Sequence, residues 1–132
     1  MKAIFITLIF VLFTKISFAQ STSEVPPQNI STDSSVTFRL FSTRNIYTFI
    51  KLNTRNGQMW QVQWSAKGSE YRFETILSVN PLVYTEDEKN GRFFLYPTSN
   101  IYNLILLDQI DGRAWQVQWG NKVEDRMVLR IN

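Results

Sequence analysis

The chain has 132 residues, which is room for one small domain once a leader is removed, but not for two. It contains no Cys and no His, and this excludes disulfide frameworks, thiol nucleophiles, Ser-His-Asp triads and zinc sites of the Cys/His type. Hydrophobic residues make up 44% and charged residues 19%, as in globular domains, whereas the aromatic share of 14% is high. We therefore expect a domain that is stabilised by a dense apolar core alone.

Residues 1–19 are typical of a secretory signal peptide. Lys2 supplies positive charge at the start, residues 4–13 are almost entirely apolar, and Ser17 and Ala19 are the small residues expected at positions −3 and −1 of a cleavage site. The apolar run is shorter than the roughly 20 residues that a spanning helix needs. We expect cleavage after Ala19, export to the periplasm or the cell exterior, and no membrane span in the mature protein.

The net charge of +3 comes largely from this leader. Without Lys2 and Lys15, 12 of the 14 basic side chains remain, against 11 acidic ones. No basic cluster of the kind that binds phosphate backbones is left, so nucleic acid is not an expected partner. Residues 20–35 are polar, rich in Ser and Thr, and carry Pro26 and Pro27, which predicts a flexible linker before the folded domain of residues 36–132.

From residue 36 onward the chain repeats itself at a spacing of 55 residues. Residues 38–65 align with residues 93–120, and one pentapeptide recurs unchanged: Trp60-Gln61-Val62-Gln63-Trp64 and Trp115-Gln116-Val117-Gln118-Trp119. A shared pentapeptide with two Trp residues, in register with further upstream matches, indicates a duplication. We place repeat 1 at residues 36–80 and repeat 2 at residues 91–132.

Each repeat predicts four β-strands. The segments are rich in β-branched and aromatic residues and are bounded by turn formers; they cover residues 36–42, 46–53, 58–65 and 70–79, then 92–96, 101–108, 113–120 and 125–131. Asn56-Gly57 and Asp111-Gly112 are hairpin signals. The expected fold is all-β, a tandem duplication of a roughly 55-residue four-stranded antiparallel unit in a small sandwich or barrel. The alternative is self-association, because each unit has the strand count of a propeller blade.

The two Trp pairs have two interpretations. Alternation along a strand puts the Trp and Val side chains on one face and the Gln side chains on the other. The favoured interpretation is that the Trp faces of the two repeats meet in the core, because each Trp buries about 150–250 Å² that a domain without disulfides needs. The alternative is a pair of aromatic platforms for a glycan, formed by Trp60, Gln61, Gln63, Trp64, Trp115, Gln116, Gln118 and Trp119.

The turn between the second and third strands leaves the register open. A loop of two or four residues places the Trp face with Phe49 and Lys51, whereas a three-residue loop places it with Ile50 and Leu52. Asp108, which aligns with Asn53, precedes this turn. The exchange of Asp for Asn keeps a hydrogen-bond acceptor and removes the charge, which favours a cap on the turn backbone over a catalytic acid.

Carboxylate pairs could still support catalysis in a chain without His or Cys. Glu70 with Glu74, or the acidic run at residues 86–88, could serve glycoside hydrolysis, and this is the second alternative function. The acidic run lies among turn formers and lacks the ligand spacing of a calcium loop. No catalytic residue, metal site or cofactor is expected.

Residues 91–119 carry the pattern GRFxLYPTxNxYxxxLLDxxDGRxWQVQW, with Phe94 at the first variable position. This stretch resembles a family of small, functionally uncharacterised secreted bacterial proteins, and the leader ending Phe18-Ala19-Gln20 is similar to those of Bacteroidota. The resemblance implies an exported bacterial protein and assigns no activity. The sequence as a whole predicts a non-catalytic β domain, a binding or structural module of the bacterial envelope, whose partner is an unidentified protein or glycan.

Overall fold

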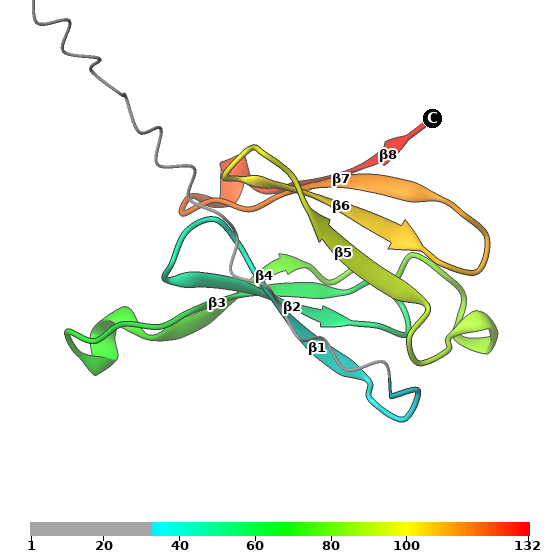
Figure 1. Ribbon diagram of the computed structural model, residues 1–132, viewed down its shortest axis with the longest axis horizontal. Helices are drawn as coiled ribbons and strands as arrows, with labels where there is room; N and C mark the ends of the chain where they lie inside the picture. Colours follow the sequence, from blue (N-terminus) through cyan, green and yellow to red (C-terminus); the bar gives the residue numbers. More distant parts are fainter. Residues whose placement is uncertain (1–32) are drawn as a thin grey trace, which may run out of the picture.

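The computed structural model describes residues 33–132, which form two stacked four-stranded antiparallel sheets (Figure 1). Sheet 1 contains β1 (Phe38–Ser42), β2 (Thr48–Asn53), β3 (Met59–Gln63) and β4 (Phe73–Ser78). Sheet 2 contains β5 (Phe93–Pro97), β6 (Asn103–Asp108), β7 (Ala114–Gln118) and β8 (Met127–Ile131). Three short 3-10 helices lie in the connections between strands: η1 (Ser69–Tyr71) before β4, η2 (Thr85–Asp87) before β5 and η3 (Val123–Asp125) before β8.

The predicted all-β class and the four-stranded repeat unit are confirmed. Each sheet is a meander in chain order, and the two sheets form a sandwich without closing into a barrel. The expected signal peptide and residues 20–32 of the expected linker lie outside the described residues. Within residues 33–132, no helix has the length and apolarity needed to span a membrane.

Both central hairpins turn through four residues. In sheet 1 the N–H of Asn53 donates to the carbonyl of Gln58 over 2.9 Å, and the N–H of Gly57 donates back to Asn53 over 3.0 Å. Asp108, Arg113 and Gly112 repeat these bonds in sheet 2 over 2.8 and 2.9 Å. Of the two registers that the sequence left open, the even-numbered loop is therefore the one adopted.

The register that follows is the same in both sheets. Lys51 pairs with Trp60, and Leu106 pairs with Trp115. Side chains directly opposite one another in an antiparallel pair lie on the same face. The Trp residues of each sheet therefore share a face with the odd-numbered residues of β2 or the even-numbered residues of β6.

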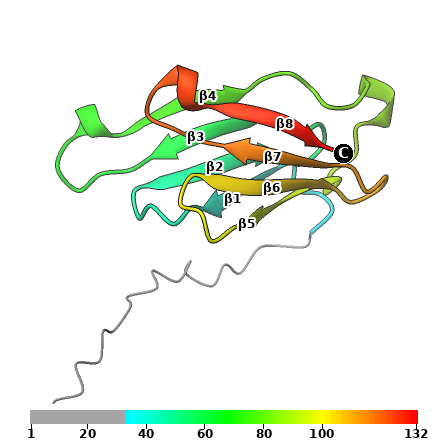
Figure 2. The same cartoon turned by 90° about the horizontal axis from the view of Figure 1, so that it is seen from above.

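The core lies between the two sheets. Its buried members come from both repeats: Phe41, Ile50, Leu52, Met59, Leu77, Phe93, Leu95, Leu104, Leu106, Trp115, Val117 and Trp119. Figure 2 shows that the strands of the two sheets follow one another in the same order across the sandwich, with β8 beside β4. The second sheet is thus stacked on the first with its strands in the same order, so the two repeats are not related by a two-fold axis.

Thr54, in the turn of sheet 1, ties the two repeats together. Its side chain is fully buried; its Oγ1 donates to the carbonyl of Thr37 over 2.8 Å and accepts from the N–H of Gly91 over 3.0 Å. Its own carbonyl accepts the N–H of Phe93 over 2.9 Å. The first strand of sheet 2 therefore starts on the turn of sheet 1, and all of the polar groups named here are paired.

The two turn glycines differ in their surroundings. Gly57 and Gly112 have positive φ angles of 82° and 79°, which L side chains adopt only with strain. A Cβ on Gly57 would meet Leu82 at 2.8 Å, whereas a Cβ on Gly112 would meet nothing within 4 Å.

We predict that both Gly57→Ala and Gly112→Ala lower the free energy of unfolding by about 1 kcal/mol through the left-handed backbone. Gly57→Ala should lose a further amount, on the order of 1 kcal/mol, because Leu82 must move. Urea unfolding of the two variants measures the difference, and equal losses would show that Leu82 does not constrain the turn.

Candidate functional site

The duplicated pentapeptides lie on equivalent strands but face opposite layers of the sandwich. In β3, Gln61 is only 3% exposed and points into the core, while Trp60 lies on the outside of the sheet. In β7, Trp115 and Val117 are 6% and 0% exposed and form part of the core, while the Gln residues lie outside. Only one Trp face is therefore internal, and the expected meeting of two Trp faces does not occur.

Each sheet thus has two chemically distinct faces, named here by the pentapeptide side chains that they carry. In sheet 1 the Gln face is internal; it comprises Arg39, Phe41, Ile50, Leu52, Met59, Gln61, Thr75 and Leu77. In sheet 2 the Trp face is internal; it comprises Phe93, Leu95, Leu104, Leu106, Trp115, Val117, Trp119 and Val128. The sandwich joins the Gln face of sheet 1 to the Trp face of sheet 2.

The two outer faces are the complementary pair. The outer Trp face of sheet 1 comprises Phe38, Leu40, Phe49, Lys51, Trp60, Val62, Trp64, Glu74 and Ile76. The outer Gln face of sheet 2 comprises Tyr96, Ile105, Leu107, Ala114, Gln116, Leu129 and Ile131. Phe94, on the edge strand β5, packs against the core instead, with its ring centroid 5.0 Å from that of Phe41. Leu40 and Ile76 are 49% and 54% exposed on the first, and Leu129 is 54% exposed on the second.

Of the Trp residues in the glycan hypothesis, one is exposed, one is partly covered and two are buried. Trp64 is 44% exposed and packs beside Tyr47, with ring centroids 5.4 Å apart. Trp60 is half-buried, with the ammonium of Lys51 4.8 Å from its ring centroid. Trp115 and Trp119 belong to the core.

The four Gln residues of that hypothesis make hydrogen bonds within the protein. Gln61 Oε1 accepts the N–H of Gly120 across the sandwich over 3.0 Å. The other three Gln side chains donate through Nε2: Gln63 to Tyr71 O over 3.4 Å, Gln116 to Asn103 Oδ1 over 2.8 Å, and Gln118 to Asp125 O over 2.7 Å. These side chains therefore hold loops and strands in place, and Gln61 also joins the two sheets.

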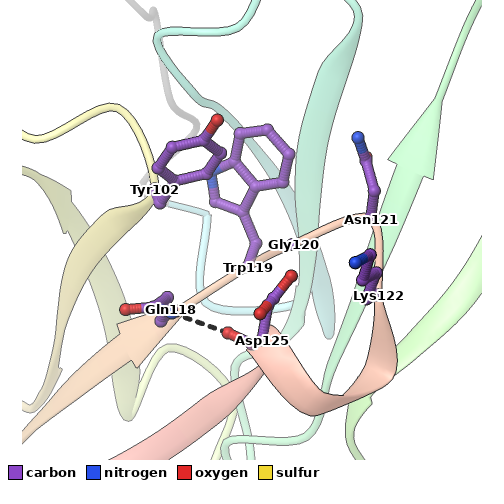
Figure 3. Close-up of a pocket in the computed structure, with 7 residues that line it drawn as sticks. All are labelled: Tyr102, Gln118, Trp119, Gly120, Asn121, Lys122 and Asp125. Carbon is purple, nitrogen blue, oxygen red and sulfur yellow. Dashed lines mark hydrogen bonds between the residues drawn. The ribbon is translucent and has the colours of Figure 1, made fainter.

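Two repeat-equivalent hollows lie at the ends of β3 and β7. The hollow of repeat 2, of about 380 Å³, is shown in Figure 3; it is lined by Tyr102, Gln118, Trp119, Gly120, Asn121, Lys122 and Asp125. The hollow of repeat 1, of about 390 Å³, is lined by Tyr47, Gln63, Trp64, Ser65, Ala66, Lys67 and Tyr71. We call these the repeat-2 notch and the repeat-1 notch.

The notches share a scaffold but differ in what they expose. In both, the Trp Nε1 donates to a backbone carbonyl, Ile46 O over 2.7 Å or Ile101 O over 3.0 Å, so the indole N–H is already used. In the repeat-2 notch Trp119 is 2% exposed, and the open wall carries Lys122 and Asp125. Both notches expose a Tyr ring, Tyr47 or Tyr102, but only the repeat-1 notch also exposes Tyr71 and an indole, that of Trp64.

The carboxylates of the hydrolase hypothesis make separate structural contacts. Glu74 forms an ion pair with Lys51 on the outer Trp face, and Glu88 accepts a hydrogen bond from Asn56 over 3.0 Å. Glu70 lies exposed in η1. Across residues 33–132, no group of three or more acidic residues is arranged to hold a metal ion.

Asp108 caps its turn as expected and also forms a buried ion pair that the sequence did not reveal. Its Oδ1 accepts the N–H of Ile110 over 3.0 Å, as Asn53 Oδ1 accepts that of Arg55 in repeat 1. Asp108 is fully buried, and Arg92, 9% exposed, contacts it through Nε over 3.0 Å and Nη2 over 2.9 Å. This hydrogen bonding raises the pKa of Arg92 above its ordinary value, so the guanidinium stays charged.

The same turn keeps a second carboxylate ionised. The backbone N–H of Arg113 donates to Asp111 over 2.9 Å and lowers the pKa of that carboxyl below its ordinary value of 3.8. Asp111 therefore remains an anion near Arg92, at 3.5 Å from its guanidinium. In repeat 1 the positions of Arg92 and Asp108 are held by Thr37 and Asn53, so both charges are absent together.

We predict that Arg92→Thr lowers the free energy of unfolding by about 3 kcal/mol, because the buried Asp108 loses its nearest counter-charge and keeps only the more exposed Arg113, whose Nη2 lies 3.4 Å away. Arg92→Thr combined with Asp108→Asn installs the uncharged pair of repeat 1 and should recover most of this loss. Urea unfolding of the two single variants and the double variant measures the coupling. A double variant no more stable than Arg92→Thr would contradict it.

A scan against protein-family models and searches of curated proteins and of solved structures found no match to this chain. The two repeats can, however, be compared with each other. They share the strand register, the turns, the Asx caps and the Tyr–Trp notch. They differ in which face the other sheet covers, and in the ion pair of Arg92 and Asp108, which only repeat 2 contains.

Proposed function

We propose that the protein is an exported, non-catalytic β domain of the bacterial envelope that serves as a binding or structural module through the outer faces of its two sheets. The observation that carries this proposal is the apolar character of both outer faces. Soluble monomers rarely leave large contiguous apolar patches open, and such patches usually mark interaction sites. Tyr96, Leu129 and Ile131 on one face and Phe38, Leu40 and Ile76 on the other are all at least 43% exposed.

Two further features support the proposal. The leader-like segment at residues 1–19 supports export. The chain has no His or Cys, and Glu74, Glu88 and Asp108 are engaged in contacts that hold the fold together, which supports a non-catalytic role. A protein of this kind works by the area and shape of its surface rather than by a reactive group.

The proposal predicts that the protein produced with its own leader in a bacterial host is cleaved before Gln20 and recovered with the envelope or with large complexes. Leu40→Lys and Leu129→Lys each put a charge on one outer face and should shift the protein several-fold toward the free soluble fraction. Val123→Lys is the matched control, because Val123 is 74% exposed but lies on η3, away from both faces. Mass spectrometry of the mature N-terminus and quantitative fractionation measure these outcomes.

Recovery of the unaltered protein as a free, small species in the soluble fraction would contradict the proposal. So would loss of a measured glycan hydrolysis in Glu70→Gln or Glu74→Gln, since that result would revive the hydrolase hypothesis.

A second candidate function is glycan binding at the repeat-1 notch. Trp64 is exposed there beside Tyr47, Tyr71 and Lys67, and aromatic rings with a nearby polar group suit a sugar ring. The supporting surface is one notch rather than the paired platforms that the sequence suggested as an alternative.

For this candidate we predict saturable binding of an oligosaccharide in calorimetry, weakened about fivefold by Trp64→Ala, since an aromatic contact contributes on the order of 1 kcal/mol. Leu40→Ala is the control, because Leu40 shares the outer Trp face but does not line the notch. Absence of heat with cell-wall and plant-type oligosaccharides alike, or an equal effect of the two variants, would exclude the notch as a glycan site.

A further inference from the structure

The interface inside the sandwich joins unlike faces, and this leaves the matching pair of unlike faces outside. The Gln face of sheet 1 packs on the Trp face of sheet 2. In the alignment of the repeats, the outer Gln face of sheet 2 is equivalent to the inner Gln face of sheet 1. The outer Trp face of sheet 1 is equivalent to the inner Trp face of sheet 2. Each molecule therefore presents both halves of an interface that it already contains.

The outer Gln face of sheet 2 preserves the residues that make the internal contact. Ile105 and Leu107 stand where sheet 1 has Ile50 and Leu52, which are fully buried. Four further equivalences are conservative in size or more apolar: Tyr96 for Phe41, Gln116 for Gln61, Leu129 for Thr75 and Ile131 for Leu77. Ala114 is the exception, because it is smaller than the buried Met59 of sheet 1. A face exposed only to solvent is usually more polar than this one.

The outer Trp face of sheet 1 preserves the opposite half. Trp60, Val62 and Trp64 stand where the core has Trp115, Val117 and Trp119. Phe38, Leu40 and Phe49 likewise stand where sheet 2 has Phe93, Leu95 and Leu104. At these six positions the outer surface is therefore as apolar as the core.

We propose that copies of this protein stack head to tail, the outer Trp face of one copy packing on the outer Gln face of sheet 2 in the next as the two sheets pack inside each copy. The partner is a second copy of this chain. Since the two faces differ, the contact is heterologous, and repeated addition produces a closed ring or an open stack. In a closed ring the four-stranded sheets are arranged like propeller blades, two from each copy.

Two polar contacts inside the sandwich specify how the copies align. Gln61 Oε1 accepts the N–H of Gly120, so Gln116 is placed to accept the N–H of Ser65 in the neighbouring copy. Arg126, on the loop before β8, donates through Nη1 to Thr75 Oγ1 over 3.2 Å and Ile76 O over 3.0 Å. Arg72 occupies the equivalent place before β4 and would reach β8 of the next copy.

One difference between the faces sets the strength of the contact. Lys51 and Glu74 form an ion pair on the outer Trp face, where sheet 2 has Leu106 and Val128 in its core. Burying an ion pair in place of apolar side chains opposes association. The stack is therefore weaker than the internal interface, and Lys51→Leu combined with Glu74→Val should tighten it at least tenfold.

This inference rests on the proposed function and names the partner of the same faces. The test uses the exported protein purified from the host, with its mass measured by light scattering over a range of concentrations. We expect a mass above that of one chain, which is 15.5 kDa before leader removal. A fixed higher mass identifies a ring and a mass that grows with concentration an open stack. Leu40→Lys and Leu129→Lys should each be monomeric, whereas the control Val123→Lys should assemble as the unaltered protein does.

Mixing the two monomeric variants provides the decisive arm. Leu40→Lys retains an intact outer Gln face and Leu129→Lys an intact outer Trp face, so an equimolar mixture should form dimers of one copy of each and stop there. Circular dichroism and thermal unfolding verify that both variants fold. A strict monomer at all concentrations, or a single variant that dimerises alone through its remaining face, would overturn the stacking. If the purified protein is monomeric while the two substitutions still release it from the envelope fraction, the proposed function stands and the faces bind a different protein.

Discussion

The contact between the Gln face of sheet 1 and the Trp face of sheet 2 determines the rest of this molecule. It buries Trp115 and Trp119 and leaves Trp60 and Trp64 outside, although the two pentapeptides are identical. Sequence identity therefore does not confer identical surroundings. A two-fold arrangement of the repeats would have buried two like faces against each other, whereas the stacked arrangement buries one Gln face against one Trp face.

Polar groups make this stacked arrangement specific. Apolar side chains alone would tolerate sliding of one sheet over the other, whereas a buried hydrogen bond is lost when its partners move. Gln61 with Gly120 fixes one end of the interface, and Arg126 fixes the edge where β8 meets β4. Thr54 fixes the entry to sheet 2. The three contacts lie at separate positions, so together they define both the offset and the orientation of the sheets.

Much of the architecture could be predicted from the sequence because its determinants are local. The alternation of Trp, Gln and Val specified two faces, and the Asn-Gly and Asp-Gly pairs marked the hairpins. Asn53 and Asp108 were recognised as caps from the exchange of one for the other. The face that each sheet buries could not be predicted, because both faces of each sheet are apolar enough to pack in the core. The partner of Asp108 was also missed: Arg92 lies 16 residues away in the chain, and only the paired change to Thr37 and Asn53 in repeat 1 hints at the contact.

Thr54 has a consequence for how a duplicated chain can be divided. Its hydroxyl and carbonyl bond to groups on both repeats, and its side chain is fully buried. A fragment that ended at residue 80 would lose the N–H donors of Gly91 and Phe93 to Thr54, and the Gln face of sheet 1 would be exposed to solvent. Each repeat therefore depends on the other for part of its bonding and for the cover of its inner face. Cooperative unfolding of the whole domain in a single transition is the behaviour that such shared bonding imposes.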